Sequence, residues 1–173
     1  MPAYDAPALV AVHIVAALAT MAAGVVAVRT APGGRTHRRA GTAYVAGWAV
    51  LAGLGGWIGA GHPGVSPFEV MNALGVTLVL LGYAPALLPR LRPLLNRGDG
   101  RGWLRWHLRC LVASLPFLVV AGANQALPML GTGAYSMAGF YGGIALAAVV
   151  TPLAGRRLLR RHGLLPGGGA APA

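Results

Sequence analysis

The stretch GGRTHRRAGTAYVAGW, residues 33–48, decides how the chain is organised. Three arginines and a histidine fall within residues 35–39, and an apolar run follows them at once. Such a cluster is typical of three settings: a site for phosphate or nucleic acid, a metal or haem site, and the edge of a membrane span. The rest of the chain distinguishes between them.

The composition is that of a membrane protein. The chain has 173 residues, of which 56% are hydrophobic and only 10% are charged, whereas about a quarter of the residues in soluble domains are charged. Its net charge is +11, which by itself would suit a nucleic-acid partner. However, the fourteen arginines fall in three groups between long apolar runs, so they suit anionic lipid head groups better than nucleic acid. We therefore expect membrane lipids, and no nucleic acid, as partners.

Five apolar stretches of about 21 residues are each long enough to cross a hydrocarbon core of about 30 Å. They predict an all-α, polytopic membrane bundle of five transmembrane helices in a single domain, residues 1–163, with too little chain left for a soluble domain. The composition of residues 164–173, rich in Gly, Pro and Ala, predicts a disordered tail. The predicted spans are Pro7–Val28, Ala40–Ala60, Phe68–Leu88, Cys110–Leu130 and Ala134–Ala154.

The arginines also predict the orientation of the chain. They occupy residues 29–39, 90–109 and 156–161, which all lie on the same side of a five-pass chain. The positive-inside rule then places the N-terminus outside and the C-terminus in the cytoplasm of a cell inner (plasma) membrane. The first apolar run has no basic residues before it, so we do not expect a cleaved signal peptide. The stretch at 33–48 is thus, first of all, a cytoplasmic membrane boundary.

Short motifs add a family resemblance. The chain has His13 in its first span, HRRAGTAY at 37–44 and HLRCLVAS at 107–114. In this order the motifs resemble those of domain-of-unknown-function family 2306, a family of predicted bacterial membrane proteins, over about residues 10–130. The last motif departs from the family's spacing of its Arg-Ser pair. The resemblance implies a polytopic membrane protein, and it points to histidine-dependent chemistry without bringing an established activity.

Polar residues inside the spans predict a pocket in the outer leaflet. Polar side chains are expensive in hydrocarbon and tend to face the bundle interior, and three predicted spans carry them at a similar depth. We expect an acid/base enzyme of the isomerase or cyclase type there, acting without a cofactor on an amphipathic or isoprenoid-like small molecule. The alternative is that these groups only join helices by hydrogen bonds. The predicted catalytic residues are Glu69, the acid, and His13, its partner; the predicted substrate-binding residues are Asn72, Asn124, Gln125 and Thr20.

A second hypothesis is a b-type haem protein for electron transfer. Axial imidazoles must face one iron from neighbouring helices at the same depth. His37 and His107 are both predicted at the inner face, and His13 and His62 both nearer the outer face. His62 lies in a Gly/Pro loop that is poorly suited to fix an axial ligand, and His37 precedes its predicted span. The alternative for His37 and His107 is that they are interfacial residues near lipid phosphates or helix ends. A single cysteine excludes an internal disulfide and any cysteine-rich metal site.

The remaining features predict helix packing. GLGGWIG contains Gly55-x-x-x-Gly59, and Gly139-x-x-x-Gly143 has the same spacing. Small residues at this spacing let helices approach closely, which allows homo-oligomers through these faces. They also suit a third hypothesis, in which the chain is a non-catalytic subunit of a membrane complex.

Overall fold

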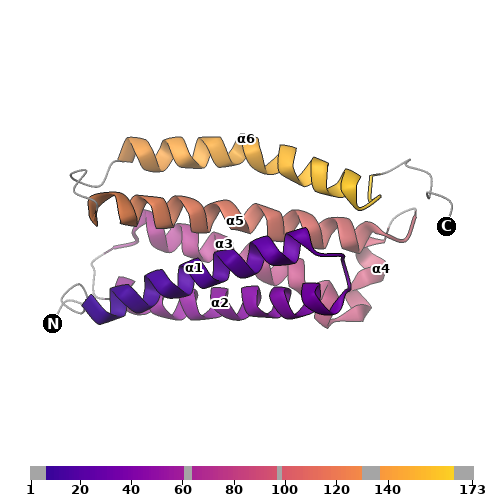
Figure 1. Cartoon of the computed structure of the whole chain (residues 1–173), viewed down its shortest axis with the longest axis horizontal. Coiled ribbons are helices and arrows are strands. Elements are labelled where there is room, and N and C mark those ends of the chain that lie inside the picture. Colours follow the sequence, from indigo (N-terminus) through magenta and orange to yellow (C-terminus); the bar gives the residue numbers. More distant parts are fainter. Residues whose placement is uncertain (1–6, 61–63, 97–98, 130–136, 166–173) are drawn as a thin grey trace.

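The computed structural model describes residues 7–60, 64–96, 99–129 and 137–165, and within these ranges the chain is helical without strands. The long helices lie along an elongated bundle, and the described turn between the first two helices is at one of its ends (Figure 1). The elements are α1 (Pro7–Arg29), α2 (Arg35–Gly59), α3 (Pro67–Leu87), the 3₁₀ turn η2 (Pro89–Leu91), α4 (Arg92–Leu95), α5 (Gly102–Met129) and α6 (Met137–Arg161).

Four of the long helices form the body of the bundle. α1 packs on α2, α2 on α3, α3 on α5, and α5 also meets α1. The last helix, α6, packs mainly on α5 and lies at the edge of the bundle (Figure 1). The core where these helices meet is formed by Tyr44, Trp48 and Leu51 of α2, with Val79 of α3 and Leu118 of α5.

Helices α1, α3, α5 and α6 are long and apolar enough to cross a membrane, as judged over the described residues. These four helices overlap the first, third, fourth and fifth predicted spans, whereas α2, which contains most of the second predicted span, is not among them. It has 25 residues, three of them arginines near its start and six of them glycines, which lower its hydropathy. Its length of about 37 Å would still cross a bilayer. A membrane span at α2, and with it the total of five spans, stays a prediction.

The large side chains of α2 fit against glycines of its neighbours. A Cβ atom at Gly24 of α1 would lie 2.7 Å from the Tyr44 ring, and one at Gly75 of α3 would overlap the Trp48 ring. Because Cβ atoms do not occur at such distances, the absence of a side chain at these two positions is what lets the aromatic rings reach the bundle centre.

Where the structure describes them, glycines of the predicted small-residue motifs contact neighbouring helices of the same chain. Gly55 lies against the Asn72 amide, and Gly143 lies against Val120. Their partners Gly59 and Gly139 lie outside the residues whose side-chain surroundings are described. Self-association through these faces stays a prediction.

The last helix ends later than the apolar pattern predicts. Gly163, at φ +63°, closes a Schellman turn in which the Leu164 N–H donates to the Leu159 carbonyl at 2.8 Å. Leu164 is buried, so this residue, which composition assigned to the tail, belongs to the folded helix end. Residues 166–173 of the predicted tail lie outside the described residues.

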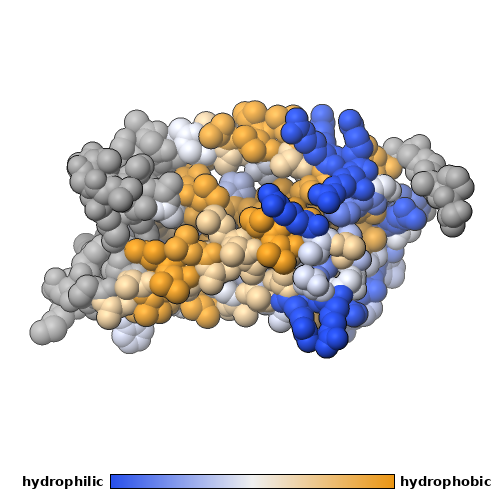
Figure 2. Space-filling view, viewed as in Figure 1, coloured by the Kyte–Doolittle hydropathy of each residue, from blue (hydrophilic) through white to orange (hydrophobic). Residues whose placement is uncertain are grey.

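Polar and apolar surfaces are separated along the bundle. Hydrophilic side chains gather toward one end, and apolar side chains cover most of the rest of the described surface in this view (Figure 2). The end that carries the α1–α2 turn, residues 88–96 and the C-terminal end of α6 is called the basic end below (Figure 1). The many exposed Val, Leu and Ile side chains on this surface suit contact with lipid.

Candidate functional site

Two histidines from different helices meet at the basic end. His37 lies in the first turn of α2 and His107 in the second turn of α5. Their ring centroids are 6.3 Å apart, and the ring planes are tilted by 59°. The sequence analysis placed His37 before its helix. This was wrong, because α2 begins at Arg35 and its first turn is basic rather than apolar.

Both rings are fixed by backbone carbonyls. His37 Nδ1 lies 2.9 Å from the Ala27 carbonyl of α1, and His107 Nδ1 lies 2.8 Å from the Gly82 carbonyl of α3. A carbonyl oxygen can only accept, so each Nδ1 is the donor and carries the proton. In the neutral imidazoles, Nε2 is therefore the basic nitrogen with a free lone pair. The same Nδ1–H···O=C bond orients metal-binding histidines in other proteins.

Pro85 shapes the α3 side of this site. A proline lacks an N–H and leaves the carbonyl four residues earlier without its helical donor. Here that carbonyl belongs to Leu81, and the Trp106 indole N–H donates to it at 3.0 Å. The next carbonyl, of Gly82, accepts the Nδ1–H of His107. α5 can lie this close because Gly82 has no side chain: a Cβ there would be 2.8 Å from Cys110 Cβ.

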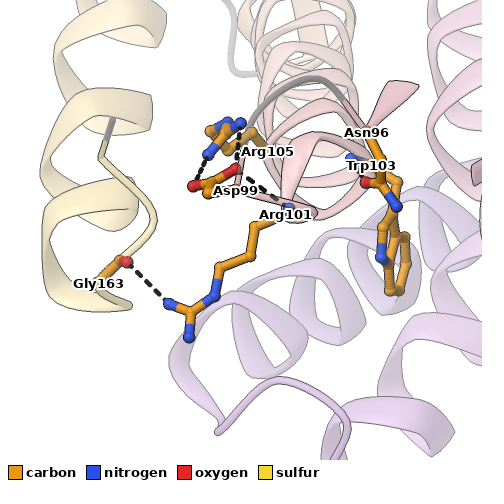
Figure 3. Close-up of polar contacts among 6 residues, drawn as sticks. All are labelled: Asn96, Asp99, Arg101, Trp103, Arg105 and Gly163. Atoms are coloured by element: carbon orange, nitrogen blue, oxygen red, sulfur yellow. Dashed lines mark hydrogen bonds and ion pairs between the residues drawn. The ribbon is translucent and has the colours of Figure 1, made fainter. Parts of the chain in front are cut away.

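The loop before α5 is held by polar contacts (Figure 3). Asp99 forms a bidentate ion pair with Arg105, with N–O distances of 2.6 and 2.8 Å, and accepts the Arg101 N–H. The bonds to Arg105 hold the pKa of Asp99 at about 2, so this exposed carboxylate stays charged at physiological pH. The Arg101 guanidinium reaches the Gly163 carbonyl at 3.4 Å, which joins this loop to the end of α6.

A second set of contacts orients the first turn of α5. The Asn96 side chain accepts the Trp103 N–H at 3.2 Å (Figure 3). The Trp103 ring lies 4.5 Å from the Arg92 guanidinium on one side, and its centroid is 6.4 Å from that of His107. The Trp103 ring is thus in contact with a cation and lies beside one imidazole of the histidine pair.

A second contact between α2 and α5 lies seven residues further along both helices. The Tyr44 and Ser114 hydroxyls are 2.7 Å apart, and Ser114 donates to the Leu111 carbonyl, so Tyr44 is the donor to Ser114. Both side chains are buried. Seven residues are two helical turns, about 10.5 Å, so the two pairs form two levels on matching faces of α2 and α5. The sequence analysis noted Ser114 only for its unusual spacing; the equal spacing of His37–Tyr44 and His107–Ser114 is the signal that could have found it.

Gly41 lies between these two levels. It follows His37 by four residues and precedes Tyr44 by three, so the three share one face of α2. A Cβ atom added at Gly41 would have no atom within 4 Å. The face of α2 beside His37 is therefore open, unlike the tightly packed face at Trp48.

A third histidine, His162, lies close enough to His37 for the two to interact electrostatically. It directly follows α6. Burial is the largest cause that lowers the pKa of His162, and the charges of Arg161 and His37 lower this pKa further. In the part of the chain that the structure describes, however, no three or more His, Cys, Asp or Glu side chains are arranged to hold a metal ion.

The predicted acid, Glu69, forms a capping box at the start of α3. Its carboxylate accepts the Ser66 N–H at 2.6 Å, and its own N–H donates to Ser66 Oγ at 3.3 Å. This reciprocal contact satisfies donors that the first turn of a helix leaves free. A structural role for Glu69 is thus present, and a role as proton donor stays a prediction.

The other residues of the predicted outer pocket are found mainly between helices. Thr20 donates to the Ala16 carbonyl of its own helix at 2.6 Å and packs against α2, while Asn72 packs on Gly55. His13 is half-buried, and its Nδ1 has no hydrogen-bond partner among the described residues. Asn124 and Gln125 lie in α5, but their side chains are outside the description.

Comparison with known proteins adds no relative: no family model, no curated protein and no solved structure matches this chain. The resemblance to domain-of-unknown-function family 2306 therefore rests on the motifs alone and stays a prediction. The structure does give these motifs a common location, because their residues His37, Tyr44, His107 and Ser114 meet in the two levels between α2 and α5.

Proposed function

We propose that the chain is a membrane protein that binds a b-type haem between His37 and His107 and serves in electron transfer. The observation that carries the proposal is the geometry of this pair. His37 of α2 and His107 of α5 lie with their ring centroids 6.3 Å apart. Each Nδ1 is held by a backbone carbonyl, which leaves each Nε2 available as a ligand.

The number of ligands favours haem over a simple ion. A structural zinc site takes four protein ligands and a catalytic one takes three, whereas the described residues offer no group of three or more. A haem brings most of its own iron ligands, so His37 and His107 would be the two residues that hold it. When bound, the haem would supply a one-electron redox couple. The chain would supply the two Nε2 ligands and the carbonyls that orient them.

The surroundings of the pair fit a flat macrocycle. Gly41 leaves the face of α2 beside His37 open. The Tyr44–Ser114 contact then closes the bundle about 10.5 Å further in, and its hydroxyls are already satisfied by each other and by Leu111. Such a floor places no unpaired polar group against an apolar ring edge.

The absorbance spectrum of the purified protein tests the proposal. After expression with haem available, or after titration with haemin, we expect one haem per chain. We also expect a Soret band that shifts on reduction with dithionite, with the sharp bands of six-coordinate low-spin iron. A folded protein that stays colourless under both conditions would contradict the proposal.

The proposed topology has five spans, with the N-terminus outside and the C-terminus in the cytoplasm of a plasma membrane. It is supported by the gathering of hydrophilic side chains toward one end of the bundle (Figure 2). A fluorescent protein fused after Arg161 is expected to fluoresce, since it folds in the cytoplasm. Alkaline phosphatase fused at the same position is expected to be inactive. The opposite pair of results would show that the chain is inverted or has an even number of spans.

A second candidate function keeps the outer-leaflet acid/base site, and the unpartnered Nδ1 of His13 favours it. Two substitutions at Glu69 distinguish a role in helix capping from a role as proton donor. Glu69→Ala removes the capping box and is expected to lower the free energy of unfolding by about 1 kcal/mol, whereas Glu69→Gln keeps the cap. If Glu69 is also a general acid, Glu69→Gln should slow conversion of prenyl lipids in membrane extracts by about 100-fold at unchanged stability. Equal conversion by the wild type and by Glu69→Gln would show that Glu69 acts only as part of the helix cap.

A further inference from the structure

A cavity of about 360 Å³ lies between α3, α5 and α6, away from the histidine pair. It exists because α6 packs mainly on α5, which leaves a space toward α3. Its walls are apolar apart from one threonine, and no charged side chain lines it. The principal lining residues are Met71, Pro116, Phe117, Ile144, Thr151 and Pro152.

The cavity is continuous with the apolar surface that would face lipid. Ile144 forms part of its wall and is itself exposed, and exposed Leu146, Val149 and Val150 flank it on α6. Water is absent from the hydrocarbon region at this depth. An occupant therefore enters from the lipid phase, which requires an apolar body.

The cavity also has a polar backbone group that comes from a proline. Pro152 has no N–H, so the carbonyl of Ala148 lacks its helical donor. Ala148 lines the cavity, next to the Thr151 hydroxyl. The equivalent carbonyl at Pro85 has a donor, the Trp106 indole. By analogy, the Ala148 carbonyl at the cavity favours a ligand that brings a hydroxyl donor, because an unpaired polar group in hydrocarbon is costly.

The volume of the cavity and its lack of charged lining residues limit the class of ligand that it can bind. At about 30 Å³ for each water-sized group, the cavity holds about 12 non-hydrogen atoms, which suits one substituted ring and not a complete lipid. A phospholipid head group would bring a charge that no lining residue neutralises. A neutral ring with oxygens at its edge and a prenyl tail left in the lipid meets both conditions. We propose that this cavity binds the head group of a prenylated quinone, whose ring oxygen accepts the Thr151 hydroxyl, or of its quinol, whose hydroxyl also donates to the freed Ala148 carbonyl.

The cavity and the histidine pair share helix α5, but the proposal for the cavity does not depend on the proposal for the histidine pair. Ala113, at the cavity wall, follows His107 on α5 by six residues, an axial rise of about 9 Å. The binding proposal rests on the lining of the cavity alone, so it can hold or fail separately from the haem proposal.

Matched substitutions on α6 test the site. Ala147 lines the cavity, whereas Ala145 is exposed on the same helix and is not among the lining residues. Ala147→Phe should fill the cavity, and Ala145→Phe places the same ring in lipid. We would titrate the purified, nanodisc-reconstituted protein with a quinone that carries two isoprene units and follow quenching of tryptophan fluorescence.

We expect saturable binding to the wild type and to Ala145→Phe, and at least tenfold weaker binding to Ala147→Phe. Thr151→Val removes one hydrogen bond and should weaken quinone binding about five- to tenfold. It should not change binding of a prenyl hydrocarbon without oxygens, which we expect to compete poorly with the quinone. Equal affinity of wild type and Ala147→Phe, or equal competition by the hydrocarbon, would overturn the proposal. The Soret absorbance of each variant, recorded on the same samples, reports separately on the haem proposal.

Discussion

Replacing either His37 or His107 with alanine is expected to abolish stable haem binding. Each imidazole would supply one of the two protein ligands of the proposed site. Changes to the groups that merely orient a ligand already lower metal affinity by 10- to 100-fold, so loss of a ligand should lower haem affinity by at least about 100-fold. The measurement is the ratio of Soret to protein absorbance after purification, together with a haemin titration.

His162→Ala is the matched control for these two variants. His162 is at the same end of the bundle and within electrostatic reach of His37, but it directly follows α6, outside the pair formed by α2 and α5. This variant should keep the wild-type spectrum. Circular dichroism should show that all three variants remain helical. Haem retention in both His37→Ala and His107→Ala would rule out this pair as the axial ligands.

The second large effect is expected from Gly75→Val. A side chain at Gly75 would overlap the Trp48 ring, and Trp48 is buried in the core cluster. Forcing extra atoms into a packed core costs about 1–3 kcal/mol, and here α2 and α3 would have to separate. We expect the free energy of unfolding, measured by denaturant titration in mixed micelles, to fall by at least this amount.

Two further variants decide whether the effect comes from this contact. Gly53→Ala is the control, since Gly53 lies within α2 and a Cβ there would meet nothing within 4 Å. Alanine has the higher helix propensity, so this change should be neutral or stabilising by up to about 1 kcal/mol. Trp48→Leu makes room and should recover part of the loss in the double variant with Gly75→Val. No recovery, or an equal loss from Gly53→Ala, would show that helix propensity rather than packing is responsible.

Much of the fold follows from the sequence because lipid imposes simple rules. Each of the five predicted apolar stretches lies within or overlaps a long helix of the structure, since hydrocarbon leaves the backbone no other hydrogen-bond partner. The helix ends were predicted less well. α5 begins at Gly102 rather than near Cys110, and α6 continues to Arg161. Hydropathy marks where lipid ends, whereas a helix continues until a cap or a glycine such as Gly163 ends it.

The predicted outer site shows the limit of reasoning from depth along each helix. Equal depth placed Glu69 and His13 in one layer, but depth does not define the direction in which a side chain points. The Ser66 hydroxyl and N–H lie one turn from Glu69, and this local contact engages the carboxylate. S-P-F-E, with Ser and Glu three residues apart, is the capping-box pattern and could have been read from the sequence.

The sequence by itself determined that the chain is apolar and helical, and it placed the arginines in three groups. These properties depend on composition and on neighbours along the chain, which any sequence displays. The tertiary structure alone decided that His37 meets His107 and that Tyr44 meets Ser114. These contacts join residues 70 positions apart, and they depend on glycines that set how closely the helices approach and on a proline that turns carbonyls toward a neighbour. Packing in three dimensions, rather than periodicity along one helix, therefore selected which histidines form a pair.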